Sequence, residues 1–259
     1  MPGKRYRPAP KKVYTMELHI YKDGDELSVE MAKWLVNYIA ATLKKQDRFT
    51  LVLSGGSTPH KLNTLLAAAP YKEQVDWTRL HIFWGDERFV PLSDDRSNAK
   101  MAFDTLLNHV PVPASQIHVM RTENIIPEVA AGEYEKILHE YFPATVPASS
   151  TFDLILLGMG DDGHTLSLFP GMHIMHEEDK WATSLFLKEQ DMFRITLTTP
   201  VVNRSACIAF LVSGAGKAIA LQQVIEGDYQ PDVYPSQIIK PVNGELYWFV
   251  DKAAAANLE

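Results

Sequence analysis

The chain has 259 residues, 25 of them basic and 32 acidic, so its formal net charge is −7. The acidic balance argues against nucleic acid as a partner. No apolar run approaches the ~20 residues that a membrane span needs, so no membrane is expected as a partner either. The single cysteine, Cys207, excludes an internal disulfide framework, and a cytoplasmic location is therefore expected.

The first residues are basic, and no apolar segment follows them, so they do not form a secretory signal. Along the rest of the chain, apolar runs typical of strands alternate with helical patterns. We expect residues 1–14 to be a flexible tail and residues 15–259 to form a single α/β domain, because no repeat and no long Gly/Ser linker interrupts them. In chain order, the patterns predict a strand at 17–21, a helix at 27–43, a strand at 49–54, a helix at 58–69, a strand at 80–87, helices at 97–110 and 129–142, strands at 152–158, 193–198 and 206–213, a helix at 216–227 and a strand at 246–250.

Two of these helices carry further detail. The first has an apolar stripe at helical spacing, made of Leu27, Met31, Trp34, Tyr38 and Ile39. In the second, Thr58 is expected to be the N-cap and Pro59 the first helical residue.

The strands are continuous apolar runs, which is typical of strands covered on both faces. Their alternation with helices predicts an α/β fold with a mostly parallel sheet. Ligands of such folds bind outside the carboxyl ends of the strands, so the residues that follow each strand are the candidates for a functional site.

The turn after the second strand, SGGSTP, has the residue types of a phosphate site. Two glycines allow close approach of a ligand to the backbone, hydroxyls flank them, and the following helix points free N–H groups at the turn. An ordinary glycine turn before a helix remains the alternative. The candidate residues are Ser54, Gly55, Gly56, Ser57 and Thr58.

The segment GDERFVP follows the third strand. Arg88 is a candidate for binding an anionic substrate through its planar fork, and Asp86 for orienting a catalytic group. A solvated loop with an ion pair is the alternative.

The segment GMGDDGH follows the strand at 152–158 and ends in His164, the best candidate for proton transfer near neutral pH. Asp161 and Asp162 precede it and are placed to hold its tautomer. A structural histidine in a turn is the alternative interpretation.

Two more cations follow or begin strands. Lys217, in SGAGKA, lies at a helix start, and Arg194 begins the strand FRITLT. SGAGKA is not a P-loop, because Leu211 and Ala218 stand where that motif needs a glycine and a hydroxyl, so nucleotide hydrolysis is not expected. Neither H-E-x-x-H nor a cysteine cluster is present, so no metal site is expected.

Together, SGGSTP, GDERFVP, GMGDDGHTLSLFPG, RITLT and SGAGKA resemble, in order and spacing, the family of glucosamine-6-phosphate isomerases and 6-phosphogluconolactonases. The resemblance covers roughly residues 15–251. It implies a Rossmann-like three-layer sandwich with no organic cofactor, acting on a phosphorylated sugar, and leaves open whether a metal ion associates weakly. It leaves the oligomeric state open, as a monomer or a small homo-oligomer.

Two features separate the branches of this family. Its deaminases place a glutamate five residues beyond the histidine, where this chain has Phe169, and the segment SLFPG is similar to the lactonase pattern. Asp161 is a departure, because many lactonases carry proline there. The resemblance therefore implies hydrolysis of 6-phospho-D-glucono-1,5-lactone in the oxidative pentose phosphate pathway, with a deaminase/isomerase or a non-catalytic sugar-phosphate sensor as the alternatives.

The resemblance also implies roles for the candidates. His164 is the general base, oriented by Asp86 or Asp162. Arg88 or glycine N–H groups stabilise the oxyanion. The SGGST turn binds the phosphate with Lys217, Arg194 and Arg88 as the cations that neutralise it.

Overall fold

The computed structural model describes residues 15–142 and 150–259, so the tail expected over 1–14 lies outside the described residues. Six strands pair in parallel in the order β1-β9-β8-β5-β2-β3. They are β1 (Thr15–Tyr21), β2 (Phe49–Leu53), β3 (Leu80–Trp84), β5 (Leu154–Leu157), β8 (Cys207–Val212) and β9 (Glu245–Asp251). The expected parallel α/β sheet is thus confirmed, and β2, β5 and β8 are buried along their whole length.

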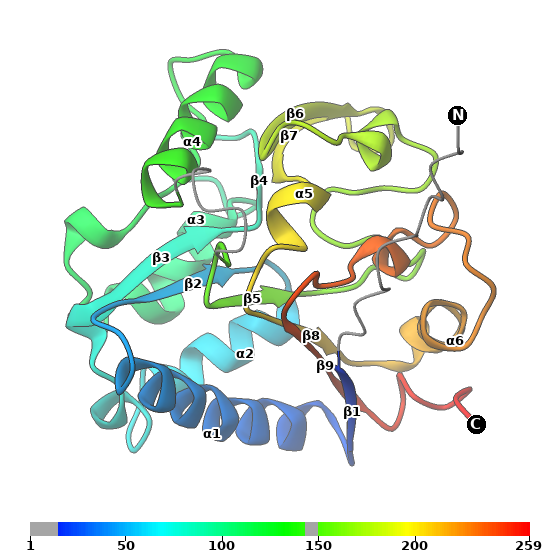
Figure 1. Cartoon of the computed structure of the whole chain (residues 1–259), viewed down its shortest axis with the longest axis horizontal. Helices are drawn as coiled ribbons and strands as arrows, with labels where there is room; N and C mark the ends of the chain where they lie inside the picture. Colours follow the sequence, from blue (N-terminus) through cyan, green and yellow to red (C-terminus); the bar gives the residue numbers. More distant parts are fainter. Residues whose placement is uncertain (1–14, 143–149) are drawn as a thin grey trace, which may run out of the picture.

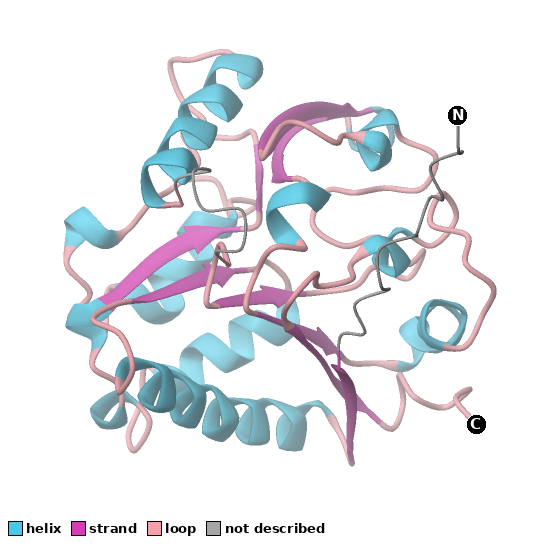
Figure 2. Cartoon of the chain, viewed as in Figure 1, coloured by secondary structure: helices cyan, strands magenta, loops and turns pink. Residues whose placement is uncertain are grey.

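Helices and a second sheet cover the two faces of this sheet (Figures 1 and 2). The helices are α1 (Gly24–Leu43), α2 (Ser57–Leu66), α3 (Asn98–Ala102), α4 (Pro127–Tyr141), α5 (Thr199–Val202) and α6 (Ala218–Ile225). Within the described ranges, no helix is long and apolar enough to cross a membrane.

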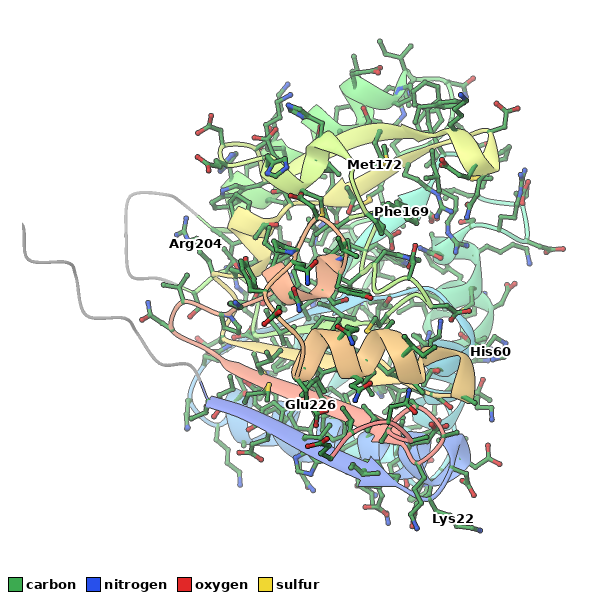
Figure 3. The ribbon with its side chains drawn as sticks, turned by 90° about the vertical axis from the view of Figure 1, so that its right-hand side faces the viewer. Lys22, His60, Phe169, Met172, Arg204 and Glu226 are labelled. Carbon is green, nitrogen blue, oxygen red and sulfur yellow. The ribbon has the colours of Figure 1, made fainter. Side chains whose placement is uncertain are left out.

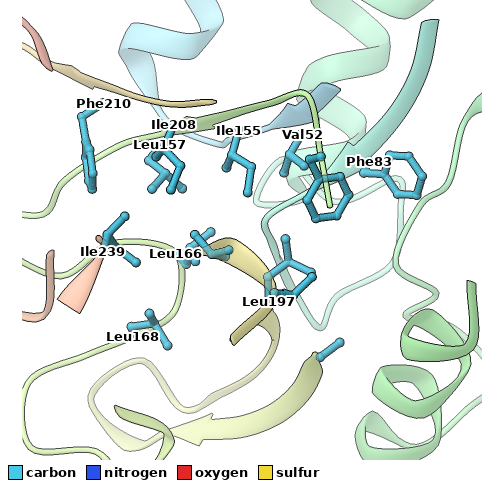
Figure 4. Packing of buried hydrophobic residues seen from close by; sticks show 14 of the residues in the cluster. Val52, Phe83, Ile155, Leu157, Leu166, Leu168, Leu197, Ile208, Phe210 and Ile239 are labelled. Carbon is cyan, nitrogen blue, oxygen red and sulfur yellow. The ribbon is translucent and has the colours of Figure 1, made fainter. Parts of the chain in front are cut away.

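Alternate residues of each buried strand enter two separate cores. Leu51 and Leu53 of β2 pack with the buried faces of α1, α2 and α3. Val52, between them, packs with α4, α5, α6 and the second sheet. Figure 4 shows this second core, in which Leu166 and Leu197 lie opposite the central strands. Two cores on opposite faces of one sheet make the expected three-layer sandwich.

The second sheet is antiparallel and was not predicted. Its strands are β4 (Asp86–Arg88), β7 (Met192–Leu197) and β6 (Ala182–Leu187), in that order. The expected strand 80–87 therefore divides at Gly85. The Gly85 N–H donates to Leu53 of the central sheet, and its carbonyl accepts from Leu197 of the second. A Cβ at this position would lie 2.5 Å from the side chain of Leu166, which explains the glycine.

The five predicted helices start one to three residues away from the expected positions. Helix α2 begins at Ser57 with Gly56 as its N-cap at a φ of 106°, so Thr58 as the cap and Pro59 as the first helical residue are wrong. Glycine adopts this backbone conformation at no steric cost, and no side chain caps the helix. The expected helix 97–110 is α3, capped by Ser97, followed by a π-helical turn at Phe103–Leu107.

Candidate active site

A pocket of about 240 Å³ lies at the carboxyl ends of the central strands. Segments that follow β2, β3, β5 and β8 all contribute to it, as expected for a parallel sheet. The predicted site residues that line it are Ser54, Gly55, Gly56, Asp86, Arg88, His164, Arg194 and Lys217. Ser57 and Thr58 line a separate neighbouring hollow, so their role in phosphate binding stays a prediction.

His164 is held by Asp162 within one tight turn. The Oδ1 atom of Asp162 accepts a hydrogen bond from the His164 backbone N–H at 3.1 Å and lies 2.6 Å from the ring Nδ1. These hydrogen bonds, the one to the ring above all, lower the pKa of Asp162 to about 2. Asp162 therefore stays ionised beside the imidazole at neutral pH.

Glycine at position 160 makes this turn possible. A Cβ there would lie 2.1 Å from Nδ1 of His164 and 2.5 Å from Oδ1 of Asp162. Any other side chain would therefore displace the imidazole or the carboxylate.

Phe169 forms one wall of the pocket. Its ring centroid lies 4.3 Å from that of His164, and the two planes are tilted by 33°. In the side view of Figure 3, Phe169 lies above helix α6. An apolar ring thus contacts the imidazole, at the position where resemblance to a deaminase would imply a glutamate.

Asp86 lines the pocket but is held by other partners. Ser167, fully buried, donates its hydroxyl to Oδ2 of Asp86 at 2.7 Å. The side-chain amide of Asn98 donates to the Asp86 carbonyl at 2.9 Å and lies 3.3 Å from Oδ1. Of the two aspartates that the sequence left open as partners of His164, Asp162 is therefore the one in contact with it.

Glu87 organises the start of α3 and was not predicted. Its carboxylate is 1% exposed and accepts from the backbone N–H groups of Arg88, Asn98 and Ala99, each at 2.7 Å. The Ser97 hydroxyl donates to it at 3.1 Å. Burial raises the pKa of Glu87. Glu87 thus joins β4 to α3 and places Asp86 and Asn98 at the pocket.

Gly55 and Asn98 pack directly against each other in the pocket wall. A Cβ at position 55 would lie 1.9 Å from Oδ1 of Asn98. The glycine turn after β2 is therefore needed for Asn98 to reach the pocket and Asp86.

Arg88 and Arg194 lie opposite each other on the neighbouring strands β4 and β7. Arg88 donates to the carbonyl of Arg96 and Arg194 donates to the side chain of Gln190. Within the described ranges, neither arginine pairs with a carboxylate, and the Nε atom of each is buried without a hydrogen-bond partner. Burial is the main cause that lowers the pKa of Arg194, and the charges of Asp86 and Arg88 act on it in opposite directions. Two adjacent cations, one of them buried and neither in an ion pair with a described carboxylate, are suited to bind an anion.

The sheet topology, the histidine–aspartate pair and the paired cations are typical of an α/β enzyme with a site for an anionic ligand. Among the described residues, no group of three or more His, Cys, Asp or Glu side chains could hold a metal ion.

Comparisons with known proteins agree with this class. The family model described as glucosamine-6-phosphate isomerases/6-phosphogluconolactonase matches residues 22–248. The chain is 38% identical to a protein of Oryza sativa subsp. indica named probable 6-phosphogluconolactonase 4, chloroplastic, over 94% of this chain and 77% of that protein. It is 37% identical to the 6-phosphogluconolactonase of Nostoc sp., over 93% of this chain and 98% of the relative.

Solved structures show the same architecture. The 6-phosphogluconolactonase of Trypanosoma brucei superposes with a TM-score of 0.84 at 26% identity, covering 95% of this chain and 100% of that one. A structure titled devB protein gives 0.86 at 32% identity, with coverage of 95% and 100%. The chain belongs to the family of glucosamine-6-phosphate isomerases and 6-phosphogluconolactonases.

Proposed function

We propose that this protein hydrolyses 6-phospho-D-glucono-1,5-lactone to 6-phosphogluconate, the second step of the oxidative pentose phosphate pathway. The observation that carries the proposal is one pocket in which His164, held from behind by Asp162, lies with two arginines that have no carboxylate partner among the described residues. Relatives named 6-phosphogluconolactonase, 37–39% identical to this chain, support it.

In the proposed mechanism, His164 takes a proton from a water molecule as the water attacks the lactone carbonyl carbon. Asp162, on Nδ1, holds the ring in the tautomer whose Nε2 accepts that proton, and stabilises the imidazolium that forms. Arg88 or glycine N–H groups stabilise the oxyanion of the tetrahedral intermediate. The bond to the ring oxygen then breaks, and His164 returns the proton to the departing alkoxide.

The substrate phosphate binds between the SGGS turn and the cations. Ser54, Gly55 and Gly56 come from the turn, and Arg194 and Lys217 line the same pocket. A hydrogen bond to a charged group contributes roughly 1.5–3 kcal/mol, so two or three such contacts dominate substrate affinity.

Two sequence alternatives are disfavoured by the site. The deaminase needs further proton carriers, and Phe169 places an apolar ring against His164 instead. A sensor only binds its ligand, so it does not require a histidine whose ring is held by an ionised carboxylate. A cytoplasmic location and a monomer or small homo-oligomer stay predictions.

The test is turnover of freshly made lactone, with spontaneous ring opening subtracted, beside ammonia release from glucosamine 6-phosphate. We expect rapid hydrolysis and no ammonia. Ammonia release would identify a deaminase, and binding of 6-phosphogluconate without turnover would identify a sensor.

A further inference from the structure

The pocket cations differ in whether they already have a counter-ion. Arg88 and Arg194 have no carboxylate partner among the described residues, whereas Nζ of Lys217 lies 2.5 Å from Oδ1 of Asp161. An anion that enters the pocket therefore meets two available guanidinium groups and one ammonium that is already neutralised.

The two partners of this ion pair are unequally exposed. The side chain of Asp161 is 72% exposed and that of Lys217 is 26% exposed. Asp161 lies against the segment that carries the lysine, since a Cβ at Gly216 would be 3.5 Å from its Oδ2. No hydrogen bond to another described residue anchors the Asp161 carboxylate. It can therefore leave Lys217 for water at little cost, while the lysine stays at the pocket.

We propose that Asp161 competes with the phosphate of the substrate for Lys217, and so sets the affinity of the site for phosphorylated ligands. This inference rests on the proposed function, in which Lys217 binds the phosphate. A phosphate that reaches Lys217 either displaces the Asp161 carboxylate or lies beside it as a like charge, and both weaken binding.

The competition has two consequences for the reaction. A monoanion that displaces Asp161 exchanges one unit of charge for another and gains little, whereas a phosphate dianion gains more, so the pair favours dianions. As the product leaves, the Asp161 carboxylate can form its ion pair with Lys217 again. Asp161 thus favours release of 6-phosphogluconate, which carries the same phosphate as the substrate.

The experiment replaces the carboxylate and leaves the lysine. Asp161→Asn is expected to lower the KM for 6-phosphogluconolactone, and the inhibition constant of 6-phosphogluconate, by the same factor of about two to five, the range of an exposed ion pair. The KM for unphosphorylated glucono-1,5-lactone is expected to change by less than this factor, because that substrate has no phosphate to compete for Lys217.

Asp191→Asn is the matched control. It removes the same charge next to Gln190, which lines the pocket, and asparagine tolerates the φ of 46° found there. We expect it to leave both constants unchanged. In a Lys217→Met background, Asp161→Asn is expected to lose its effect, because the contested cation is gone.

The proposal is overturned if Asp161→Asn raises the KM or leaves it unchanged, or if Asp191→Asn lowers it equally. A raised KM would show that Asp161 positions Lys217 for the phosphate. An equal effect of Asp191→Asn would show that the KM responds to the net charge near the pocket and not to Asp161 itself. A wild-type protein that does not accelerate opening of the phosphorylated lactone contradicts the proposed function instead, so the two failures are distinguishable.

Discussion

At the scale of single residues, the histidine that we propose as the base, His164, depends on a tightly packed turn. Gly160, Asp162 and His164 are in close contact, and a Cβ at position 160 would clash with both side chains. The position of the proposed base is thus controlled by a glycine that has no side chain to take part in the reaction.

Gly160→Ala is therefore expected to lower kcat by about 10²-fold, because it displaces the imidazole by a large fraction of an ångström or more. The measurement is steady-state lactone hydrolysis on folded protein. Gly132→Ala in α4 is the control, since a Cβ there meets nothing within 4 Å. Equal activity of the two variants would contradict the account of the turn.

Asp162 links the same turn to stability. Its pKa is about 2 in the folded protein, below the ~3.9 of an unfolded aspartate, so it contributes stability that is fully present above that higher value. That contribution is lost as the pH falls towards 2. We expect the Tm difference between wild type and Asp162→Asn to be constant above about pH 5 and to shrink between about pH 4 and 2. A difference that grows on acidification would contradict this assignment.

At the scale of elements, the site depends on the junction between β4 and α3. Glu87 accepts three backbone N–H groups and one hydroxyl there while almost fully buried. Without it, the N-terminus of α3 has unsatisfied donors, and Asn98 loses the support that holds it against Asp86.

Glu87→Gln is expected to destabilise the protein by about 1–3 kcal/mol, because an amide nitrogen faces backbone donors that need an acceptor. Urea unfolding measures the change. Glu178→Gln, at an exposed position, is the control and is expected to stay within about 0.5 kcal/mol of wild type. A Glu87 variant as stable as that control would show that the junction does not depend on the carboxylate.

At the scale of the whole molecule, the central sheet brings distant segments to one pocket, and the second sheet adds the two arginines. Arg88 and Arg194 are adjacent cations, Arg194 is 5% exposed, and neither forms an ion pair with a described carboxylate. Holding two like charges together in this way lowers the stability of the fold. The site is thus organised for an anion at some expense of stability.

Arg194→Met tests this balance. The variant keeps the apolar contacts of the stem and removes a buried charge, so its Tm without ligand is expected to equal or exceed that of wild type. Its KM for the lactone is expected to rise by about 10- to 100-fold. The Tm increase on adding 6-phosphogluconate is expected to shrink accordingly. A large loss of unliganded stability would contradict the account.

Much of the central sheet and its site could be predicted, since each buried strand is an apolar run and the polar residues behind it meet at one edge. The second sheet could not, because β4 has only three residues and continues an apolar run that divides at Gly85. Strand β6 was missed as well. In the sequence, Glu87 cannot be told apart from an exposed loop carboxylate, because its burial becomes visible only in the fold.

The choice between Asp86 and Asp162 could not be made from sequence either. Both follow buried strands, and only the folded turn brings one of them to 2.6 Å from His164. The contact between Phe169 and the imidazole likewise depends on a loop conformation, with Leu166 at a φ of 55°, that composition does not reveal.

The most direct test of the central claim is kcat for lactone hydrolysis by His164→Ala, beside wild type and a His60→Ala control at an exposed position on α2. We predict a loss of about 10²–10⁴-fold for His164→Ala with the fold intact, the usual scale for a general acid–base group, and none for the control. A loss below about threefold would show that His164 is not the base of the reaction.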